Sequence, residues 1–198
     1  MNKLIYQIRN WKAHWRAFYL GSYVLIDDAI AALFQVPATE GRSRGYGRVD
    51  AVVIKADGSR IDLGCLGKRI VTTAFLNYLR DDLTNAAGAA DISTFKYHEC
   101  GTGVTAESAA DTALGTPCTT VLNPASTRAV GTQSNAVSSV YSSVGTLTFQ
   151  GAGAAVTEHG LFNTTTTGTL MDRTVFAAIN VAALDSIQFT YTLTLSGS

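Results

Sequence analysis

Apolar and polar residues alternate strictly near the end of the chain. In the run SIQFTYTLTL, residues 186–195, every second position is apolar, and Gln188 and threonines fall between them. A second run, AVSSVYSSVGTLTF, gives Tyr141, Leu147 and Phe149 the same parity. Successive side chains of a strand point to opposite faces of a sheet. The two runs therefore predict strands with one buried face and one face toward water or a partner.

A hairpin is predicted earlier in the chain. The runs VDAVVIKA and SRIDLG flank Asp57-Gly58, a dipeptide that tolerates the positive φ angles of a tight type I′ turn. In such a hairpin Val53 pairs with a residue near Ile61.

The apolar period changes from two to about 3.6 after this hairpin. Between Lys68 and Leu83 the apolar residues recur at steps of three and four, and Arg80, Asp81 and Asp82 fall on the opposite side. This spacing predicts one amphipathic helix over residues 68–83.

Turn segments such as GTG, NPAS, GAG and TTTTG separate the later strands. The pattern predicts a mainly β fold, an antiparallel β-sandwich or jelly-roll-like domain over residues 47–198. The Pro/Gly/Arg-rich stretch PATEGRSRGYGR marks its beginning, and residues 1–46 are expected to form an N-terminal arm. The periodicity of the arm is weak, so packing on its own domain and packing on a neighbouring subunit both remain open.

Charge changes the picture only at the N-terminus. The formal net charge is +0, so no overall field attracts nucleic acid or an anionic membrane. Basic residues nevertheless crowd the first quarter of the chain, which is either a contact surface for an acidic partner or a solvated helix face. The candidate attachment residues of the arm are Trp11, Trp15, Arg16, Phe18, Tyr19, Arg42 and Arg44.

The arm resembles neither a signal peptide nor a membrane span. Arg9, Lys12, His14 and Arg16 interrupt its apolar residues, and both kinds of segment need an unbroken apolar run. The chain has three cysteines and no CxxC motif, which fits neither a disulfide framework nor a zinc cluster. Reduced thiols and synthesis in the cytoplasm are therefore expected.

The sequence VTEHGLFN, residues 156–163, contains the most suggestive chemical pair, Glu158-His159. Adjacent residues of a strand point to opposite faces, so the two side chains cannot act on one atom without a bulge. We therefore expect no catalytic dyad and instead a structural salt bridge from Glu158 to Arg128 or Arg173.

His98 and Cys100 lie two residues apart and share one face of a strand, but two ligands do not make a metal site. A strand end with a buried thiol is the simpler interpretation. The dinucleotide-binding, P-loop and nucleophile-elbow motifs do not occur, and no cofactor is expected.

A series of motifs from about Gly47 onward resembles a group of virion structural proteins of tailed bacteriophages. The series covers roughly three-quarters of the chain, and residues 1–46 have no counterpart in that group. Its members are GRVDAVVIKADGS with IDLG, KRIVTTAFLNYL, FKYHECGTGVTAESAADTAL, NPASTRAVGTQ, VTEHGLFN and GTLMDRTVF.

The resemblance implies a β-rich module on a phage particle with no active-site residue. It implies that Gly101, Gly103 and the Thr112-Ala113-Leu114 turn shape loops and that Arg128 belongs to a strand. It also implies that Glu158, His159 and Gly160, together with Asp172 and Arg173, are internal ties.

The expected function is that of a capsid decoration (cement) protein, a homo-oligomer that clamps neighbouring major capsid protein subunits in the virion. Touching several subunits at once would add avidity. A tail, neck or fibre component is the first alternative. A carbohydrate-binding or hydrolytic sandwich domain is the second, with Tyr141, Tyr191 or Trp11 as sugar platforms. No direct contact with nucleic acid or membrane is expected.

Overall fold

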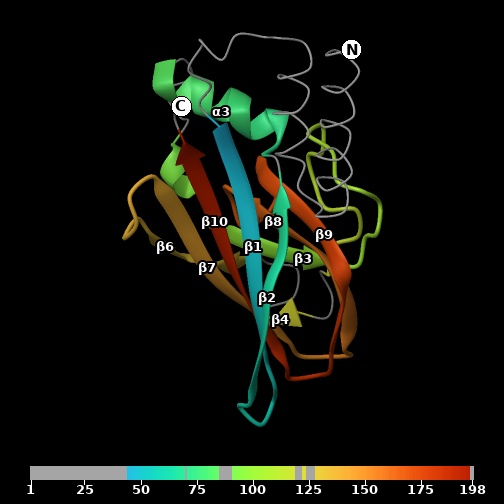
Figure 1. The fold of residues 1–198 in the computed structure, drawn as a ribbon. Helices are drawn as coiled ribbons and strands as arrows, with labels where there is room; N and C mark the ends of the chain where they lie inside the picture. Colours follow the sequence, from blue (N-terminus) through green and yellow to red (C-terminus); the bar gives the residue numbers. More distant parts are fainter. Residues whose placement is uncertain (1–43, 70, 85–90, 119–121, 124–127, 197–198) are drawn as a thin grey trace, which may run out of the picture. The chain divides into compact units, whose positions relative to one another are not determined.

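The computed structural model describes residues 44–69, 71–84, 91–118, 122–123 and 128–196. They belong to a compact unit that spans Ser43–Ser196. Two antiparallel sheets pack against each other in this unit, with one α-helix at one end of the strands (Figure 1). The predicted class, a mainly β fold of the β-sandwich type with one helix, is confirmed.

The larger sheet has six strands. Its order is β2-β1-β10-β7-β4, and β6 also pairs with β7. The strands are β1 (Arg44–Ile54), β2 (Arg60–Arg69), β4 (Leu122–Asn123), β6 (Thr132–Ser134), β7 (Val140–Phe149) and β10 (Ser186–Ser196). Strand β1 already begins at Arg44, which pairs with Ser196 of β10. The sandwich therefore includes residues 44–46, which the sequence pattern assigned to the arm.

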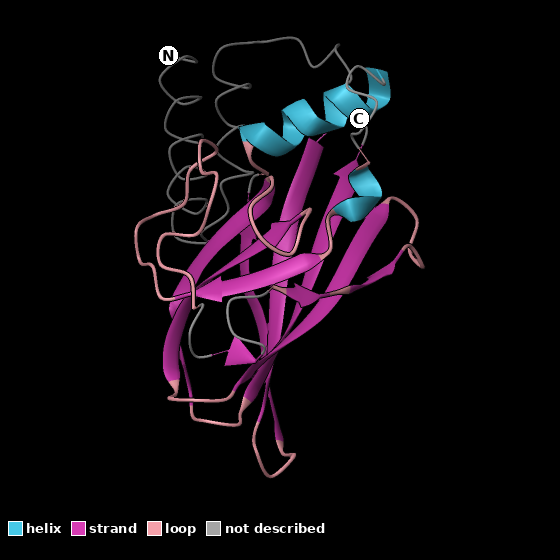
Figure 2. Cartoon of the chain, turned by 180° about the vertical axis from the view of Figure 1, so that it is seen from behind, coloured by secondary structure: helices cyan, strands magenta, loops and turns pink. Residues whose placement is uncertain are grey.

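The smaller sheet has four strands in the order β5-β3-β8-β9. Its strand β3 pairs antiparallel with β8, and in the view from behind long loops lie beside it (Figure 2). The strands are β3 (Tyr97–Gly101), β5 (Ala129–Val130), β8 (Ala154–Phe162) and β9 (Leu170–Val181). The helices are α3 (Thr73–Thr84) and the 3₁₀ helix η1 (Ile92–Thr94).

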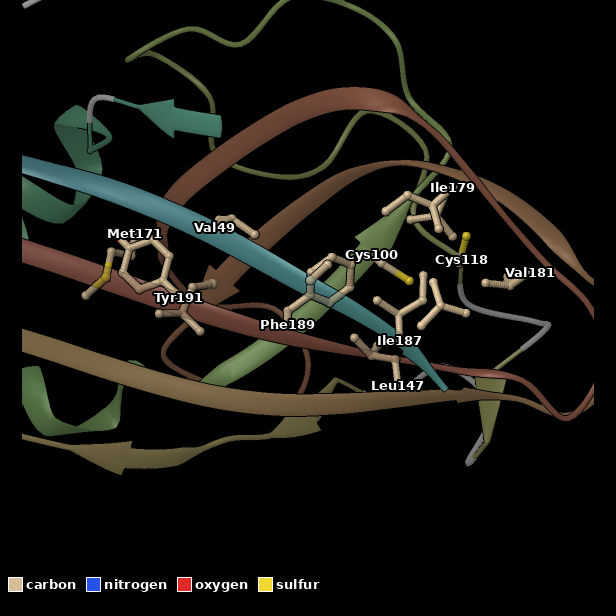
Figure 3. Packing of buried hydrophobic residues seen from close by; sticks show 14 of the residues in the cluster. Val49, Cys100, Cys118, Leu147, Met171, Ile179, Val181, Ile187, Phe189 and Tyr191 are labelled. Carbon is tan, nitrogen blue, oxygen red and sulfur yellow. The ribbon is translucent and has the colours of Figure 1, made fainter. Parts of the chain in front are cut away.

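The main core lies between the two sheets. Strand β10 supplies its centre, because Ile187, Phe189, Tyr191 and Leu193 are all buried and alternate with half-buried polar residues. Val49 of β1 and Met171 of β9 approach from the two sheets (Figure 3). The predicted alternation is confirmed except at Leu195, which lies at the end of the strand and is 53% exposed.

The β1–β2 hairpin is confirmed, including the pairing of Val53 with Ile61. The prediction of a type I′ turn is wrong. The loop is longer than two residues, with the Gly58 amide donating to the Lys55 carbonyl at 2.8 Å. Among the described residues of this loop only Gly58 has a positive φ, at 84°. The rest of the pairing is irregular, with register shifts between Val49/Asp50 and Ala51/Val52 and a positive φ of 62° at Gly64.

The helix also begins later than the sequence pattern predicts. Residues 68 and 69 still belong to β2, and α3 starts at Thr73. Thr72 explains the start, because its hydroxyl accepts the Phe75 amide at 3.1 Å and so caps the first turn. The same hydroxyl donates to the Leu170 carbonyl at 2.5 Å and ties the helix to β9. Apolar spacing alone does not reveal a cap that depends on a distant strand.

Replacing Thr72 tests this double role. Thr72 is buried, so Thr72→Val keeps its shape but leaves the Phe75 amide and the Leu170 carbonyl without their partner. We expect the free energy of unfolding to fall by about 1–3 kcal/mol, measured by urea denaturation. Thr72→Ser keeps the hydroxyl and should retain most of the stability. Equal losses in the two variants would show that the methyl group matters as much as the hydrogen bonds, which would contradict the prediction.

Candidate functional site

The pair Glu158-His159 lies in β8 and faces two separate environments. Glu158 pairs with Gly101 of β3, and His159 pairs with Cys100. The carboxylate contacts the loop that follows β3, whereas the imidazole contacts the core. Both side chains are 0% exposed. The two groups point away from each other, as expected for strand neighbours, and neither reaches solvent.

Glu158 fastens the loop of residues 102–116 to the outer face of the four-stranded sheet. Its Oε1 atom accepts the amides of Gly103 at 2.9 Å and Thr116 at 2.7 Å. Its Oε2 atom accepts the Gly115 amide at 2.9 Å. Because these amides lie near the two ends of the loop, one carboxylate closes the loop on itself and on β8.

Arg173 of β9 completes this cluster. Its Nε atom donates to Glu158 Oε2 at 2.8 Å, Nη1 donates to Asp111 Oδ2 at 3.0 Å, and Nη2 donates to the Thr105 carbonyl at 3.1 Å. Burial by itself raises the pKa of Glu158, but the amides of Thr116 and Gly115 and the Arg173 guanidinium outweigh it and lower the pKa. The carboxylate is therefore ionised at neutral pH, and both of its oxygen atoms accept hydrogen bonds from the loop or from Arg173.

Two glycines make the close approach possible. A Cβ atom at Gly101 would lie 2.5 Å from Glu158 Oε1 and 2.5 Å from the Thr116 carbonyl oxygen. A Cβ atom at Gly103 would lie 2.5 Å from the same carboxylate oxygen. The GTG motif thus provides room for a carboxylate of the protein itself.

The loop also covers apolar surface. Leu114, from the Thr112-Ala113-Leu114 turn, packs with Phe162 and Leu170 into a small cluster. A Cβ atom at Gly160 would lie 2.9 Å from a Leu114 methyl carbon, so this strand position must stay small. Every residue of β8 from Val156 to Phe162 is buried as a result.

On the core side, His159 belongs to a polar network that joins the two sheets. His159 Nε2 lies 3.0 Å from His98 Nδ1, and His98 Nε2 lies 2.9 Å from the Ser143 hydroxyl of β7. The His159 ring packs on Phe189, with 4.5 Å between centroids. A Cβ atom at Gly145 would collide with the His98 ring. Each of these two contacts needs one proton, which two neutral rings and one hydroxyl can supply, while His159 Nδ1 is buried without a hydrogen-bond partner among the described residues.

Burial keeps both histidines neutral. It lowers the pKa of His98 to about 3, and burial together with the neighbouring His98 lowers the pKa of His159 well below its usual value. A serine hydroxyl beside an imidazole is the combination used in nucleophilic catalysis. Ser143, His98 and His159 are each 0% exposed, however, so this network joins sheets and presents no group to a substrate.

Arg128 fastens a second loop on the outer face. Its Nε atom lies 3.2 Å from Glu99 Oε2, and its guanidinium carbon lies 3.3 Å from the centroid of the Phe162 ring. Its Nη1 atom donates to carbonyls of the threonine-rich loop at residues 164, 166 and 167. The expectation that Arg128 belongs to a strand is wrong, because it lies just before β5. Outside the paired strand, its guanidinium can reach the carbonyl groups of the threonine-rich loop.

Asp172 is buried in β9, where its Oδ1 atom accepts the Thr174 hydroxyl at 2.9 Å. A Cβ atom at Gly47 would lie 2.5 Å from Asp172 Oδ2 and 2.8 Å from the Tyr191 hydroxyl. Tyr191 is 0% exposed, which removes it as a platform for sugars. Asp172 and Tyr191 therefore belong to the core side of the sandwich.

A groove of about 480 Å³ opens at one end of the sandwich. Ile92, Met171, Leu193 and Leu195 give it apolar walls, and Tyr141 is the only titratable residue among those that line it. The Tyr141 hydroxyl donates to the Phe95 carbonyl and to no group in the groove's opening. The groove suits apolar contact better than proton transfer.

Of the predicted attachment residues, only Arg44 falls among the described residues. Arg44 is the first residue of β1. Among the described residues, no group of three His, Cys, Asp or Glu side chains is arranged to hold a metal ion. The other attachment candidates lie outside the described residues, and they are Trp11, Trp15, Arg16, Phe18, Tyr19 and Arg42.

Sequence reasoning missed the roles of His98, Ser143 and Asp111. The signal for His98 was its strand spacing from Cys100, but the partner of a strand residue depends on the register between strands. No local pattern marks Asp111, because its contact to Arg173 joins positions 62 residues apart.

No protein-family model matches the chain, and no curated protein sequence matches it. In the part of the chain that the structure describes, no helix combines the length and the apolar character that crossing a bilayer requires.

Removing the charge of Glu158 tests the loop cluster. Glu158→Gln removes the more deeply buried of the two carboxylates that pair with Arg173 and turns an amide group toward backbone donors. We expect a loss of about 3–5 kcal/mol in the free energy of unfolding and faster proteolysis within residues 102–116. The matched control is Asp50→Asn, which breaks the partly exposed pair with Arg48 and should cost less than about 1 kcal/mol. Similar losses in both variants would contradict the central role of Glu158.

The buried histidines predict a pH dependence of stability. The folded-state pKa of His98 is about 3, below the unfolded value of about 6.5. Between these values the unfolded chain binds more protons, so stability falls as the pH drops below about 6.5. Each histidine contributes at most about 1.4 kcal/mol per pH unit in this window. Urea midpoints between about pH 7 and pH 5 measure the slope above the range where carboxylates protonate.

The double variant His98→Gln/His159→Gln is the control for that slope. Its amides can hydrogen-bond but do not titrate in this range. It should be less stable at pH 7 and should show a flatter dependence on pH. An unchanged slope would assign the acid sensitivity to other groups.

Proposed function

We propose that this protein is a non-enzymatic structural component of a tailed-bacteriophage virion. Within that class we propose a capsid decoration (cement) protein that clamps neighbouring subunits of the major capsid protein. The motif series from about Gly47 onward supports the class, because its order resembles that of virion structural proteins over roughly three-quarters of the chain.

The observation that carries the proposal is the divided use of Glu158 and His159. One side chain fastens a loop and the other joins two sheets, and both are fully buried. The polar residues that would have to converge for catalysis serve here as braces. A sandwich braced in its core and on its outer face is suited to bearing load on a particle surface.

The cement role is favoured over a tail role by the organisation of the chain. The sandwich is preceded by a segment rich in aromatic and basic residues, and such a segment would let one copy contact more than one coat subunit. The apolar groove adds a surface for protein contact. Binding to assembled coat but not to separated subunits would stabilise the shell by mass action.

Counting copies tests the placement on the particle. Quantitative mass spectrometry of purified virions, with the major capsid protein as internal standard, should give hundreds of copies for a decoration protein. A number that matches the symmetry of the tail would reject the cement role and select the tail, neck or fibre alternative. Absence from purified virions would reject the class.

Particle stability tests the clamp. Virions that lack the protein should release their genome at a temperature several degrees lower, measured with a DNA-binding dye, and adding back the full chain should restore it. A chain of residues 44–198 keeps all of β1 and should unfold like the full chain, yet it should not restore the particles. Particles without the protein that resist heat as well as complete ones would exclude cementing.

A further inference from the structure

Two buried cysteines face each other at the base of the Glu158-bound loop. Cys100 lies in β3, and Cys118 lies where the chain returns to β3 after the loop. Gly101 and Pro117 form an antiparallel bridge, with the Cys118 amide donating to the Cys100 carbonyl at 2.9 Å. The Thr102 amide donates across the same bridge to Thr116, at 2.8 Å. This register sets Cys100 directly opposite Cys118.

The register brings the two thiols within range of a covalent bond. Opposite residues of an antiparallel pair project to the same face, and a hydrogen-bonded pair has Cα atoms about 5.5 Å apart. Disulfides join Cα atoms that are about 4.4–6.8 Å apart. Both thiols are free in the structure and belong to the core cluster, and Figure 3 shows their sulfur atoms at the end of the core that contains Ile179 and Ile187.

The two thiols differ in reactivity. Cys118 is 7% exposed, whereas Cys100 is fully enclosed. Interaction with the Cys100 thiol lowers the pKa of Cys118, and the pKa of Cys100 is raised by the Cys118 thiol and by burial. The more accessible sulfur is thus also the one that ionises first, which suits it to begin an exchange reaction.

We propose that Cys100 and Cys118 are a disulfide-forming pair that locks the loop of residues 102–116 under oxidising conditions. The oxidant is a low-molecular-weight disulfide. The Cys118 thiolate attacks one of its sulfurs and releases one small thiol, and the Cys100 sulfur then attacks Cys118 and releases the second. Two protein thiols are oxidised, one external disulfide is reduced to two thiols, and the two protons pass to those thiols.

The bond would act on the same loop that Glu158 and Arg173 hold. In the folded protein these groups already fix both ends of the loop, so the bond adds little new constraint there. In the unfolded chain it closes a ring that otherwise samples many conformations. The bond therefore stabilises the fold, and it does so independently of the proposed role on a virion.

The experiment uses the full chain with Cys65→Ser, because Cys65 is exposed and would form links between molecules. The protein is refolded from urea in a buffer of reduced and oxidised glutathione, so that access to the buried thiols does not limit the reaction. We expect a mass lower by about 2 Da, the two hydrogens lost, and a peptide that joins Cys100 to Cys118. The melting temperature should rise by roughly 5–10 °C over the reduced form.

Cys65→Ser/Cys118→Ser is the matched control. It should show neither the mass change nor the rise in melting temperature under the same buffer. A folded Cys65→Ser protein that stays reduced would overturn the proposal. A lasting glutathione adduct on Cys118, or a disulfide that lowers the melting temperature, would overturn it as well.

Discussion

The outer face of the four-stranded sheet depends on the interactions of one ionised carboxylate, that of Glu158. A buried anion is costly unless charges and hydrogen bonds compensate it. Three backbone amides and the Arg173 guanidinium provide that compensation here. The loop that supplies the amides then shields β8 from water, so β8 is buried on both faces from Val156 to Phe162. The Glu158 carboxylate, the loop of residues 102–116 and strand β8 therefore stabilise one another. Without the loop, the buried carboxylate would lack its amide donors and the outer face of β8 would contact water.

The inner layer uses a different device, a neutral polar chain across the core. His98 and His159 from one sheet reach Ser143 of the other. A slip of β3, β7 or β8 by one residue within its own sheet would turn its member of this network to the other face and leave the remaining buried groups without partners. The hydrogen-bonded network therefore helps to specify how the two sheets align. Gly145 is needed opposite His98, since a larger residue would occupy the space of the ring.

Periodicity was enough to predict the class of fold and much of the strand pattern. The alternation of apolar and polar residues identified the buried side chains of β10, and the Asp57-Gly58 dipeptide located the β1–β2 hairpin. The start of α3 was missed because Thr72 is tied to Leu170, which is distant in sequence. The same limit applies to the site. Strand geometry predicted that Glu158 and His159 would separate, but their partners come from other strands and loops, and local sequence does not encode that register.

The irregular pairing of β2 has a consequence for crowded solutions. In the described strand order β2 is one of the two terminal strands of the larger sheet, and a straight terminal strand is a template for fibril growth. Exposed Ile61 and Leu63 would favour such growth, but Arg60 and Asp62 alternate with them. Asp62 also binds the Gly64 amide at 2.8 Å, beside one of the two register shifts. The bent and charged edge at β2 therefore disfavours the extension of the larger sheet through this strand from one molecule into the next when the protein is concentrated.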